Sequence, residues 1–248
     1  MIELKNREQI QLMRRAGAVV GETLEMLRGM VRAGVTTGEL DQAAEDYITK
    51  CGAKPAFKGY DGFPATLCTS INEEVVHGLP GARKLREGDI ISIDCGAYLN
   101  GYCGDAAVTL PVGDIEPERQ QLIEVCSQAL ALAIAQAETT KRLFDISSAI
   151  QVYVEKNGMS VVREYVGHGI GRQMHEDPKV PNFGRPGRGP RLTRGMVLAI
   201  EPMVNLGGYQ VEKLSDHWTV VTVDRRPSAH FEHTVAITDN GPEILTKV

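Results

Sequence analysis

The stretch from Asp89 to Leu110, DIISIDCGAYLNGYCGDAAVTL, decides the fold of this chain. Two strand-like runs flank Asn100-Gly101, and this dipeptide is the strongest short signal for a two-residue β-hairpin turn. In such a hairpin Leu99 faces Tyr102, so every other facing pair follows by counting outward from the turn. The sequence therefore predicts a long antiparallel hairpin with a defined register.

This register places two acidic residues on one face of the hairpin. Asp94 faces Ala107 and Asp105 faces Gly96, so the two acids are diagonal neighbours with Cα atoms roughly 7–8 Å apart. Among apolar neighbours they would repel each other and lose hydration unless positive charge lay between them. A pair of metal ions about 3.5–4 Å apart fits that gap. In the alternative, both acids face solvent on an edge hairpin, or a one-residue bulge separates their faces.

The composition is that of an ordinary globular protein. The chain has 248 residues, a formal net charge of −5 and five cysteines. The charge does not favour nucleic-acid or membrane binding, so we expect neither a DNA nor a membrane partner. The N-terminus lacks the apolar region of a secretory signal, and no apolar run approaches the ~20 residues of a membrane span. We therefore expect a cytoplasmic protein with reduced cysteines and a single domain over residues 1–248.

Helical patterns precede the hairpin. Apolar residues at steps of three and four predict a helix over about residues 10–31, ended by Gly34. Gly17 lies on its apolar stripe and would let another backbone approach closely. Thr36 and Glu39 have the spacing of a capping box, which predicts the start of a second helix.

The remainder of the chain repeats this order of helices followed by strands. We expect one helix to begin at Pro117 and another to be capped by Asp145 and ended by Asn157-Gly158. Strand-like runs then cover residues 159–166, 196–205, 217–223 and 230–238. The pattern predicts an α+β fold whose two similar halves, about 1–112 and 113–248, place helices over a largely antiparallel sheet.

Three more ionisable residues stand in apolar surroundings. His168 lies between glycines, Glu201 ends the run MVLAI, and Glu232 lies in HFEHTV. Each alone could be a hydrogen-bonded core residue or a strand end facing water. Together with the two hairpin acids they form an oxygen-rich set that suits hard or borderline divalent ions. His77 and His175 remain as acids or hydrogen-bonding groups.

The chain resembles the methionine aminopeptidases, and in particular the short bacterial type I enzymes. The resemblance spans nearly the whole chain and rests on five motifs in a specific order. They are SINEEVVHGLP (70–80), DIISIDCGAYLNGYCGDAA (89–107), GHGIGRQMHEDP (167–178), MVLAIEPM (196–203) and FEHTVAIT (231–238). It implies a metallopeptidase domain with the creatinase, or pita-bread, fold and a curved sheet.

The resemblance also implies a dinuclear metal site and its ligands. Asp94 would hold one ion, His168 and Glu201 the other, and Asp105 and Glu232 would bridge the two. Cobalt, manganese, iron or zinc could occupy such a set, and the sequence does not choose among them.

The same resemblance implies the residues that act on substrate. Glu201 would transfer the proton, while His77 and His175 would flank the scissile bond. The residues implied to line the methionine pocket are Tyr60, Phe63, Cys68, His77, Met174, His175 and Trp218. Met174 and Phe57 depart from the usual phenylalanine and cysteine, which leaves the exact substrate tolerance open.

The implied reaction is removal of an N-terminal methionine from new proteins whose second residue is small. One alternative is an X-Pro aminopeptidase or dipeptidase of the same fold. The other is a non-catalytic binding protein on this fold, although such proteins typically lose metal ligands and none is missing here. The expected partners are peptides and nascent chains that begin with methionine, and the chain is expected to be a monomer. The arginine-rich segment 183–194 is either a solvated loop or a contact to ribosomal RNA.

Overall fold

The structure, a computed structural model, describes residues 1–247 and contains two pairs of helices. The helices are α1 (Arg7–Arg28), α2 (Thr37–Lys50), α3 (Pro117–Ile134) and α4 (Leu143–Lys156). The strands before α3 are β1 (Lys54–Pro55), β2 (Leu67–Ile71), β3 (Glu74–Val76), β4 (Ile90–Leu99) and β5 (Tyr102–Pro111), with a short 3₁₀ turn, η1 (Tyr60–Gly62), after β1. The strands after α4 are β6 (Ser160–Val161), β7 (Gly167–Gly169), β8 (Glu176–Val180), β9 (Val197–Ile200), β10 (Met203–Asn205), β11 (Val211–Lys213), β12 (Val220–Thr222), β13 (Ser228–His230), β14 (Glu232–Thr238) and β15 (Gly241–Ile244).

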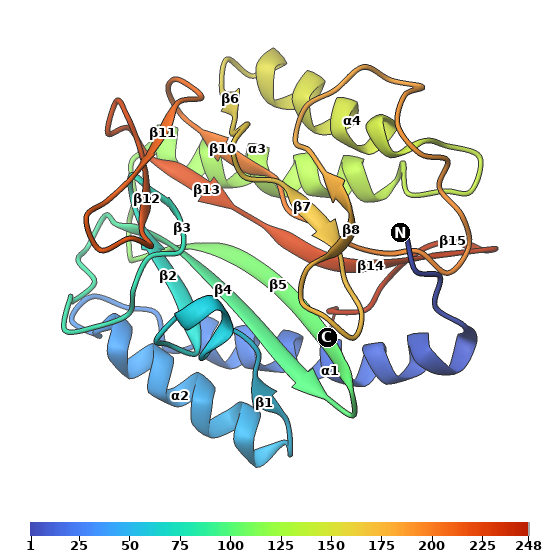
Figure 1. Cartoon of the computed structure of the whole chain (residues 1–248). Coiled ribbons are helices and arrows are strands. Elements are labelled where there is room, and N and C mark those ends of the chain that lie inside the picture. Colours follow the sequence, from blue (N-terminus) through green and yellow to red (C-terminus); the bar gives the residue numbers. More distant parts are fainter. Residues whose placement is uncertain (248) are drawn as a thin grey trace.

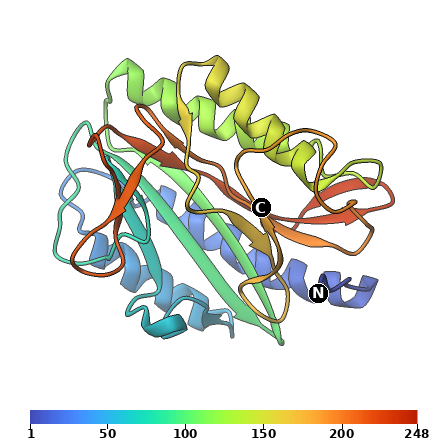
Figure 2. The ribbon, with the colours of Figure 1, turned by 45° about the horizontal axis from the view of Figure 1, so that its top comes forward.

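The two helix pairs lie along different parts of the strand layer. In Figure 1, α1 and α2 (blue) run beside the long strands β4 and β5, whereas α3 and α4 (yellow-green) run beside the strands of the second half. Figure 2 shows the same separation of the helix pairs from a second direction. The other side of the strand layer is left to loops and short strands.

A nine-stranded antiparallel sheet joins the two parts of the chain. Its main path is β1-β4-β5-β14-β9-β7-β8, with β2 added on β4 and β15 on β14. The parts meet where β5 pairs with β14, so that Ala107 faces Glu232. The predicted α+β class is confirmed, with helices over a largely antiparallel sheet. The division into related halves at about residue 112 stays a prediction.

The hairpin has the predicted register. Leu99 faces Tyr102, and from there the pairing continues without a shift to Ile90 and Pro111. Both turn residues have positive φ, 51° at Asn100 and 87° at Gly101, as a type I′ turn requires. The dipeptide therefore fixes the faces of all residues in β4 and β5.

Helix α1 packs closely against the backbone of neighbouring segments, as the position of Gly17 on its apolar stripe predicted. A Cβ at Gly17 would lie 2.3 Å from the carbonyl oxygen of Leu245, and a Cβ at Gly104 in β5 would lie 2.7 Å from the amide nitrogen of Gly17. No side chain fits between these backbones. The two glycines thus set the distance between α1 and the hairpin.

The first helix ends earlier than the sequence pattern indicated. Its last residue is Arg28, and the prediction that it reaches residue 31 and stops at Gly34 was wrong. Gly29 caps the helix, and the chain then turns so that the amide of Gly34 donates to the carbonyl of Leu85, 2.8 Å away. A long-range contact therefore decides this boundary. The capping box of Thr36 at the start of α2 is confirmed.

Two further predictions are corrected in the second part of the chain. Asp145 is the third residue of α4 rather than its cap, and its carboxylate accepts from the backbone amide of Arg142, the true cap, at 2.7 Å. The run 196–205 is two strands, β9 and β10, which belong to different sheets. Pro202 lacks the N–H that a continuous ladder needs. Glu201 consequently lies at the break between them.

Two large apolar clusters hold the helices on the strands. One joins α1 and α2 to β4 and β5, and the other joins α3 and α4 to β9 and β14. In residues 1–247 no helix combines the length and the apolar character that crossing a membrane would require.

Candidate metal centre

Five ionisable side chains share one face of the large sheet. They come from consecutive strands of its path, namely Asp94 (β4), Asp105 (β5), Glu232 (β14), Glu201 (just after β9) and His168 (β7).

Register explains why they share that face. Facing residues in neighbouring strands lie on the same side of a sheet, and so do residues two apart in one strand. Asp94 faces Ala107, which in turn faces Glu232. His168 faces Ala199, two residues before Glu201. The sheet therefore gathers residues that are up to 138 positions apart in the sequence, from 94 to 232.

The functional atoms of these residues lie close together. Nε2 of His168 is 3.5 Å from Oε1 of Glu201 and 3.8 Å from Oδ2 of Asp105. One ligand atom each from Asp105, His168 and Glu232 lies within 4.8 Å of the others. One oxygen each of Asp94, Asp105 and Glu232 is buried without any hydrogen-bond partner. Buried unpartnered carboxylate oxygens are costly, and a divalent cation would satisfy them.

Burial makes the charges of this cluster unfavourable. Burial raises the pKa of Asp94 to about 7. Burial first, and the charge of Glu232 next, raise the pKa of Asp105 well above its usual value. Burial and the other carboxylates likewise raise the pKa of Glu201 and of Glu232. Four such carboxylates can ionise together only beside positive charge.

His168 has its tautomer fixed by the backbone. Its Nδ1 lies 2.9 Å from the carbonyl oxygen of Gly169, and since a carbonyl only accepts, Nδ1 must carry the proton. The lone pair then lies on Nε2, which is the atom near Asp105 and Glu201. Burial lowers the pKa of His168 to about 4, so the ring is neutral at pH 7 and suited to bind a metal ion.

The other two predicted histidines also line this cavity. Burial lowers the pKa of His77 to about 4, and its backbone has the strained φ of 60°. The ring of His175 lies 4.3 Å from that of His168, and its Nδ1 is 2.8 Å from the hydroxyl of Tyr60. Burial also lowers the pKa of His175. The sheet and its loops thus bring two neutral imidazoles to the edge of the carboxylate cluster.

An aromatic pocket opens directly beside the carboxylates. The cavity has a volume of about 180 Å³. Phe63 and Trp218 meet edge to face, with ring centroids 5.0 Å apart. Its lining includes six of the seven residues predicted for the pocket, which are Tyr60, Phe63, Cys68, His77, His175 and Trp218. The seventh, Met174, is absent from the lining because it is buried in a separate apolar cluster, where its methyl carbon packs over Gly96.

The structure places two residues at or beside the cavity that the sequence did not predict there, Asp61 and His230. Asp61 is part of the lining, and so is Phe57, which the family resemblance had placed near the pocket. His230 is buried, and its Nε2 lies 3.8 Å from Oε2 of Glu201 without a hydrogen-bond partner. The sequence offered one signal for His230. It lies two residues before Glu232, and residues two apart in an extended strand point to the same side. Asp61 lies in the short turn Tyr60–Gly62, which carries no periodic signal.

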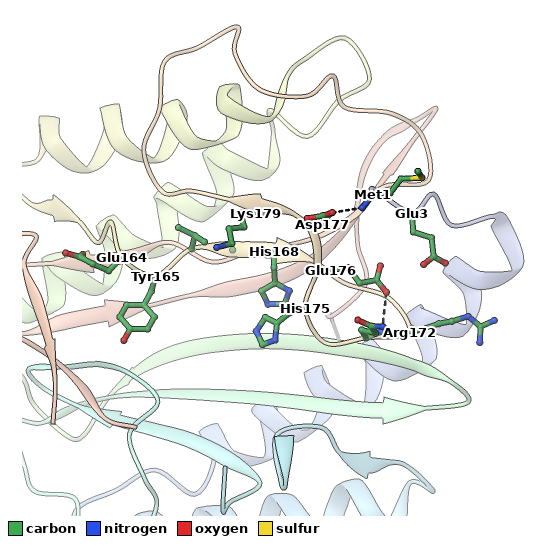
Figure 3. Close-up of a pocket in the computed structure, with 13 residues that line it drawn as sticks. Met1, Glu3, Glu164, Tyr165, His168, Arg172, His175, Glu176, Asp177 and Lys179 are labelled. Carbon is green, nitrogen blue, oxygen red and sulfur yellow. Dashed lines mark hydrogen bonds and ion pairs between the residues drawn. The ribbon is translucent and has the colours of Figure 1, made fainter. Parts of the chain in front are cut away.

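A wider cavity of about 740 Å³ leads away from the two histidines. Figure 3 shows His168 and His175 in its middle, with Tyr165 and Lys179 on one side and Glu176, Asp177 and Met1 on the other. The N-terminal ammonium group donates to Oδ2 of Asp177 at 2.6 Å. The wider cavity and the small pocket share His168 and His175 in their linings.

Fold and site together define a metal-dependent hydrolase of the pita-bread class. The chain belongs to metallopeptidase family M24, whose model matches residues 11–239. It is 60% identical over 248 residues to a methionine aminopeptidase of Clostridium perfringens, with both chains covered in full.

Solved structures agree with this membership. The chain superimposes on a methionine aminopeptidase from Thermotoga maritima with a TM-score of 0.98 and 47% identity, again over the full length of both chains. An Xaa-Pro dipeptidase from Bacillus anthracis reaches a TM-score of 0.79 at 20% identity, where 99% of this chain covers 62% of that one. The second likeness shows the shared fold alone.

Proposed function

We propose that this chain removes the N-terminal methionine from peptides and nascent proteins whose second residue is small. The observation that carries this proposal is the small aromatic pocket beside the buried carboxylates. A hydrolytic site with a pocket for one side chain suits an exopeptidase. The full-length identity to methionine aminopeptidases supports methionine as that side chain.

The five clustered residues fit two divalent metal ions. The unpartnered oxygens of Asp94, Asp105 and Glu232 and the free lone pair of His168 would supply ligands to such ions. Asp94 would hold one ion, His168 and Glu201 the other, with Asp105 and Glu232 between them. When bound, such ions polarise a carbonyl oxygen and lower the pKa of water. Manganese, iron, cobalt and zinc all accept this ligand set.

The remaining chemistry falls to groups of the chain itself. Glu201 would accept the proton of the attacking water and later pass it to the leaving amine. His175 would donate a hydrogen bond to the oxygen that becomes negative in the transition state. His77 would hydrogen-bond the scissile amide. The strained backbone of His77 is consistent with a side chain that is held in place for function.

The pocket is suited to an unbranched, polarizable side chain. The rings of Phe63 and Trp218 offer faces and edges, and thioether sulfur makes favourable contacts with ring edges. Cys68 contributes a neutral thiol, since burial raises its pKa well above the usual value. Phe57 adds a further aromatic ring to the lining, so we expect it to limit how large a side chain can enter.

Peptide hydrolysis tests the proposal directly. The purified chain, loaded in turn with each of the four metals, is incubated with Met-Ala-Ser, Met-Pro-Ser and Gly-Pro-Ser. We expect metal-dependent release of methionine from Met-Ala-Ser and no cleavage of Gly-Pro-Ser. Preferred cleavage before proline would instead indicate an X-Pro peptidase. Metal binding without any cleavage would indicate a binding protein.

A contact with the ribosome is a separate proposal. The four arginines of segment 183–194 are exposed, and the loop is held to α4 because Asp145 accepts from the amide of Gly187 at 2.7 Å. A fixed loop of positive charge suits RNA. Replacing Arg185, Arg188 and Arg191 by Glu should weaken co-sedimentation with ribosomes but leave Met-Ala-Ser cleavage intact. A monomeric state and a cytoplasmic location stay predictions.

A further inference from the structure

A hydrogen bond crosses the mouth of the cavity between residues 115 positions apart. The hydroxyl of Tyr60 and Nδ1 of His175 are 2.8 Å apart, and the two rings lie 5.2 Å apart at an angle of 45°. We propose that Tyr60 is a positioning residue, whose hydroxyl holds His175 in the tautomer that presents Nε2–H to the substrate. This inference rests on the role of His175 in the proposed function.

The chemistry of the two groups sets the direction of the bond. A neutral imidazole has one N–H and one lone pair, whereas a phenol can donate or accept. The lone pairs of a phenolic oxygen are delocalised into the ring, so phenol is a better donor than acceptor, and an imidazole nitrogen is a strong acceptor. The favoured arrangement is O–H···Nδ1. It leaves the proton of the ring on Nε2.

The environment of His175 leaves that proton available. No residue among 1–247 forms a hydrogen bond with its Nε2, and the ring lines both the small pocket and the wider opening. A donor in this position could serve an oxygen that gains negative charge. With the opposite tautomer His175 would present a lone pair there, which would repel the same oxygen.

Tyr60 is held firmly enough to act as an anchor. Its amide donates to the carbonyl of Phe57 at 2.9 Å, and its own carbonyl accepts from Phe63 at 2.8 Å. Asp61 has a φ of 47°, so the turn is tight and already strained. Phe63 in turn packs edge to face on Trp218. The backbone of Tyr60 is therefore fixed before substrate arrives, and the bond to Nδ1 of His175 places its hydroxyl.

The loop that carries His175 is fixed from the opposite side. Glu176 forms a buried ion pair with Lys5, and its carboxylate accepts from the amide of Gln173 at 3.2 Å. These contacts hold the backbone beside His175 but give its ring no hydrogen bond. Among the described residues, Tyr60 alone forms a hydrogen bond with that ring. The phenol thus supplies an orientation that the backbone does not.

The test combines ¹⁵N NMR spectra of the histidine ring nitrogens with steady-state kinetics. The full chain is labelled with ¹⁵N-histidine and loaded with diamagnetic zinc. It contains six histidines, and the signals of His175 are assigned as those missing in His175→Gln. Tyr60→Phe keeps the ring in the pocket and removes only the hydroxyl. Tyr47→Phe is the matched control, because its hydroxyl donates to Glu22 on the exposed surface, 3.0 Å away.

We expect a single Nε2–H tautomer for His175 in the unaltered protein and in Tyr47→Phe, and a mixture or the Nδ1–H form in Tyr60→Phe. The kcat for Met-Ala-Ser should fall roughly 3- to 10-fold in Tyr60→Phe, the effect of one hydrogen bond, with KM nearly unchanged. An Nδ1–H tautomer in the unaltered protein, or an unchanged tautomer in Tyr60→Phe, would overturn the positioning role. A raised KM with kcat unchanged would overturn the positioning role as well.

The two readouts separate this inference from the proposed function. If the unaltered protein cleaves no methionine peptide, the proposed function fails, whereas the nitrogen spectra still decide whether Tyr60 sets the tautomer. If cleavage is normal and the tautomer does not depend on Tyr60, only the positioning role fails.

Discussion

At the scale of single residues, Glu201 carries the most specific expectation. Glu201→Gln keeps the size of the side chain and removes its ability to accept a proton. We expect turnover of Met-Ala-Ser to fall at least ~10²-fold, the lower end of what a positioned base contributes. Glu212→Gln, an exposed glutamate that pairs with Arg225, should leave the rate unchanged. A near-normal rate in Glu201→Gln with full metal content would assign the base to another group.

Asp105 tests the metal centre independently of the base. Asp105→Ala removes an oxygen ligand from the middle of the cluster, so we expect bound metal and peptidase activity to fall together. Elemental analysis of the purified variant measures the metal content. Asp239→Ala removes an exposed carboxylate beside Arg194 and should change neither quantity. Full activity with metal still bound in Asp105→Ala would contradict the proposed ligand set.

Removal of the metal should make stability depend on pH. In the metal-free chain the folded-state pKa of Asp94 is about 7, against 3.8 for an ordinary aspartate, and that of Glu232 is raised as well. A raised pKa in the folded state means stability that is lost as pH rises through that value. Burial lowers the pKa of five histidines, and they oppose this trend only at acid pH, below about 6.5; they are His77, His168, His175, His230 and His233.

We therefore expect the Tm of the metal-free chain to fall between pH 6.5 and pH 8. The metal-loaded chain should show a much smaller fall, because cations stabilise the ionised carboxylates. Thermal unfolding with and without a chelator measures both. A metal-free Tm that rises over this range would show that the carboxylates are not buried as described.

At the scale of elements, the contact of α1 with its neighbours is the sharpest test. Gly17→Ala would place a Cβ 2.3 Å from a backbone oxygen that cannot move alone. Overpacking of this kind costs about 1–3 kcal/mol. Gly29→Ala at the end of the same helix meets nothing closer than 3.4 Å and has an ordinary φ of −69°, so it should be neutral or stabilising. Urea unfolding compares the two, and equal stabilities would contradict the close approach.

The elements that the sequence predicted well are those set by neighbouring residues. Asn100-Gly101 has only one favourable turn, and this turn alone was enough to place Asp94 and Asp105 on one face. The capping box of Thr36 is equally local. The end of α1 was missed because it depends on a hydrogen bond from Gly34 to Leu85, which no local pattern encodes.

The same distinction separates the parts of the site. The acids and His168 could be grouped from their apolar surroundings, and the family resemblance supplied the assignment of these ligands to two metal ions. The approach of His230 to Glu201 and the bond from Tyr60 to His175 depend on how distant loops meet over the sheet. Met174 was expected near the pocket from the family resemblance, but its side chain packs into a separate apolar cluster with Tyr102 and Ile170.

At the scale of the whole molecule, the protein's own N-terminus is an informative substrate. Its second residue is Ile, which is branched at Cβ and has little freedom to avoid a clash. A misfit of about 1 Å at the reacting bond can cost ~10²-fold in rate. We therefore expect the peptide Met-Ile-Glu-Leu to resist cleavage, and the otherwise identical Met-Ala-Glu-Leu to be cut rapidly.

A series Met-Xaa-Ser extends this prediction. Gly, Ala and Ser at the second position should be processed fast, Val more slowly, and Ile and Leu hardly at all. Methionine release, followed by chromatography, ranks the peptides. Comparable rates for Ala and Ile would show that Phe57 has reshaped the site and that the steric argument does not hold.

The pairing of β5 with β14 has a consequence for when a new copy of this protein becomes active. Chains emerge from the ribosome N-terminal end first, and local units can fold as they appear. The hairpin that carries Asp94 and Asp105 can form early, but Glu232 is synthesised 127 residues after Asp105. Until β14 has been made and has joined the sheet, the ligand set lacks one of its members. Each copy must therefore be almost fully synthesised before it can act, so fragments released by premature termination upstream of β14 would be inactive.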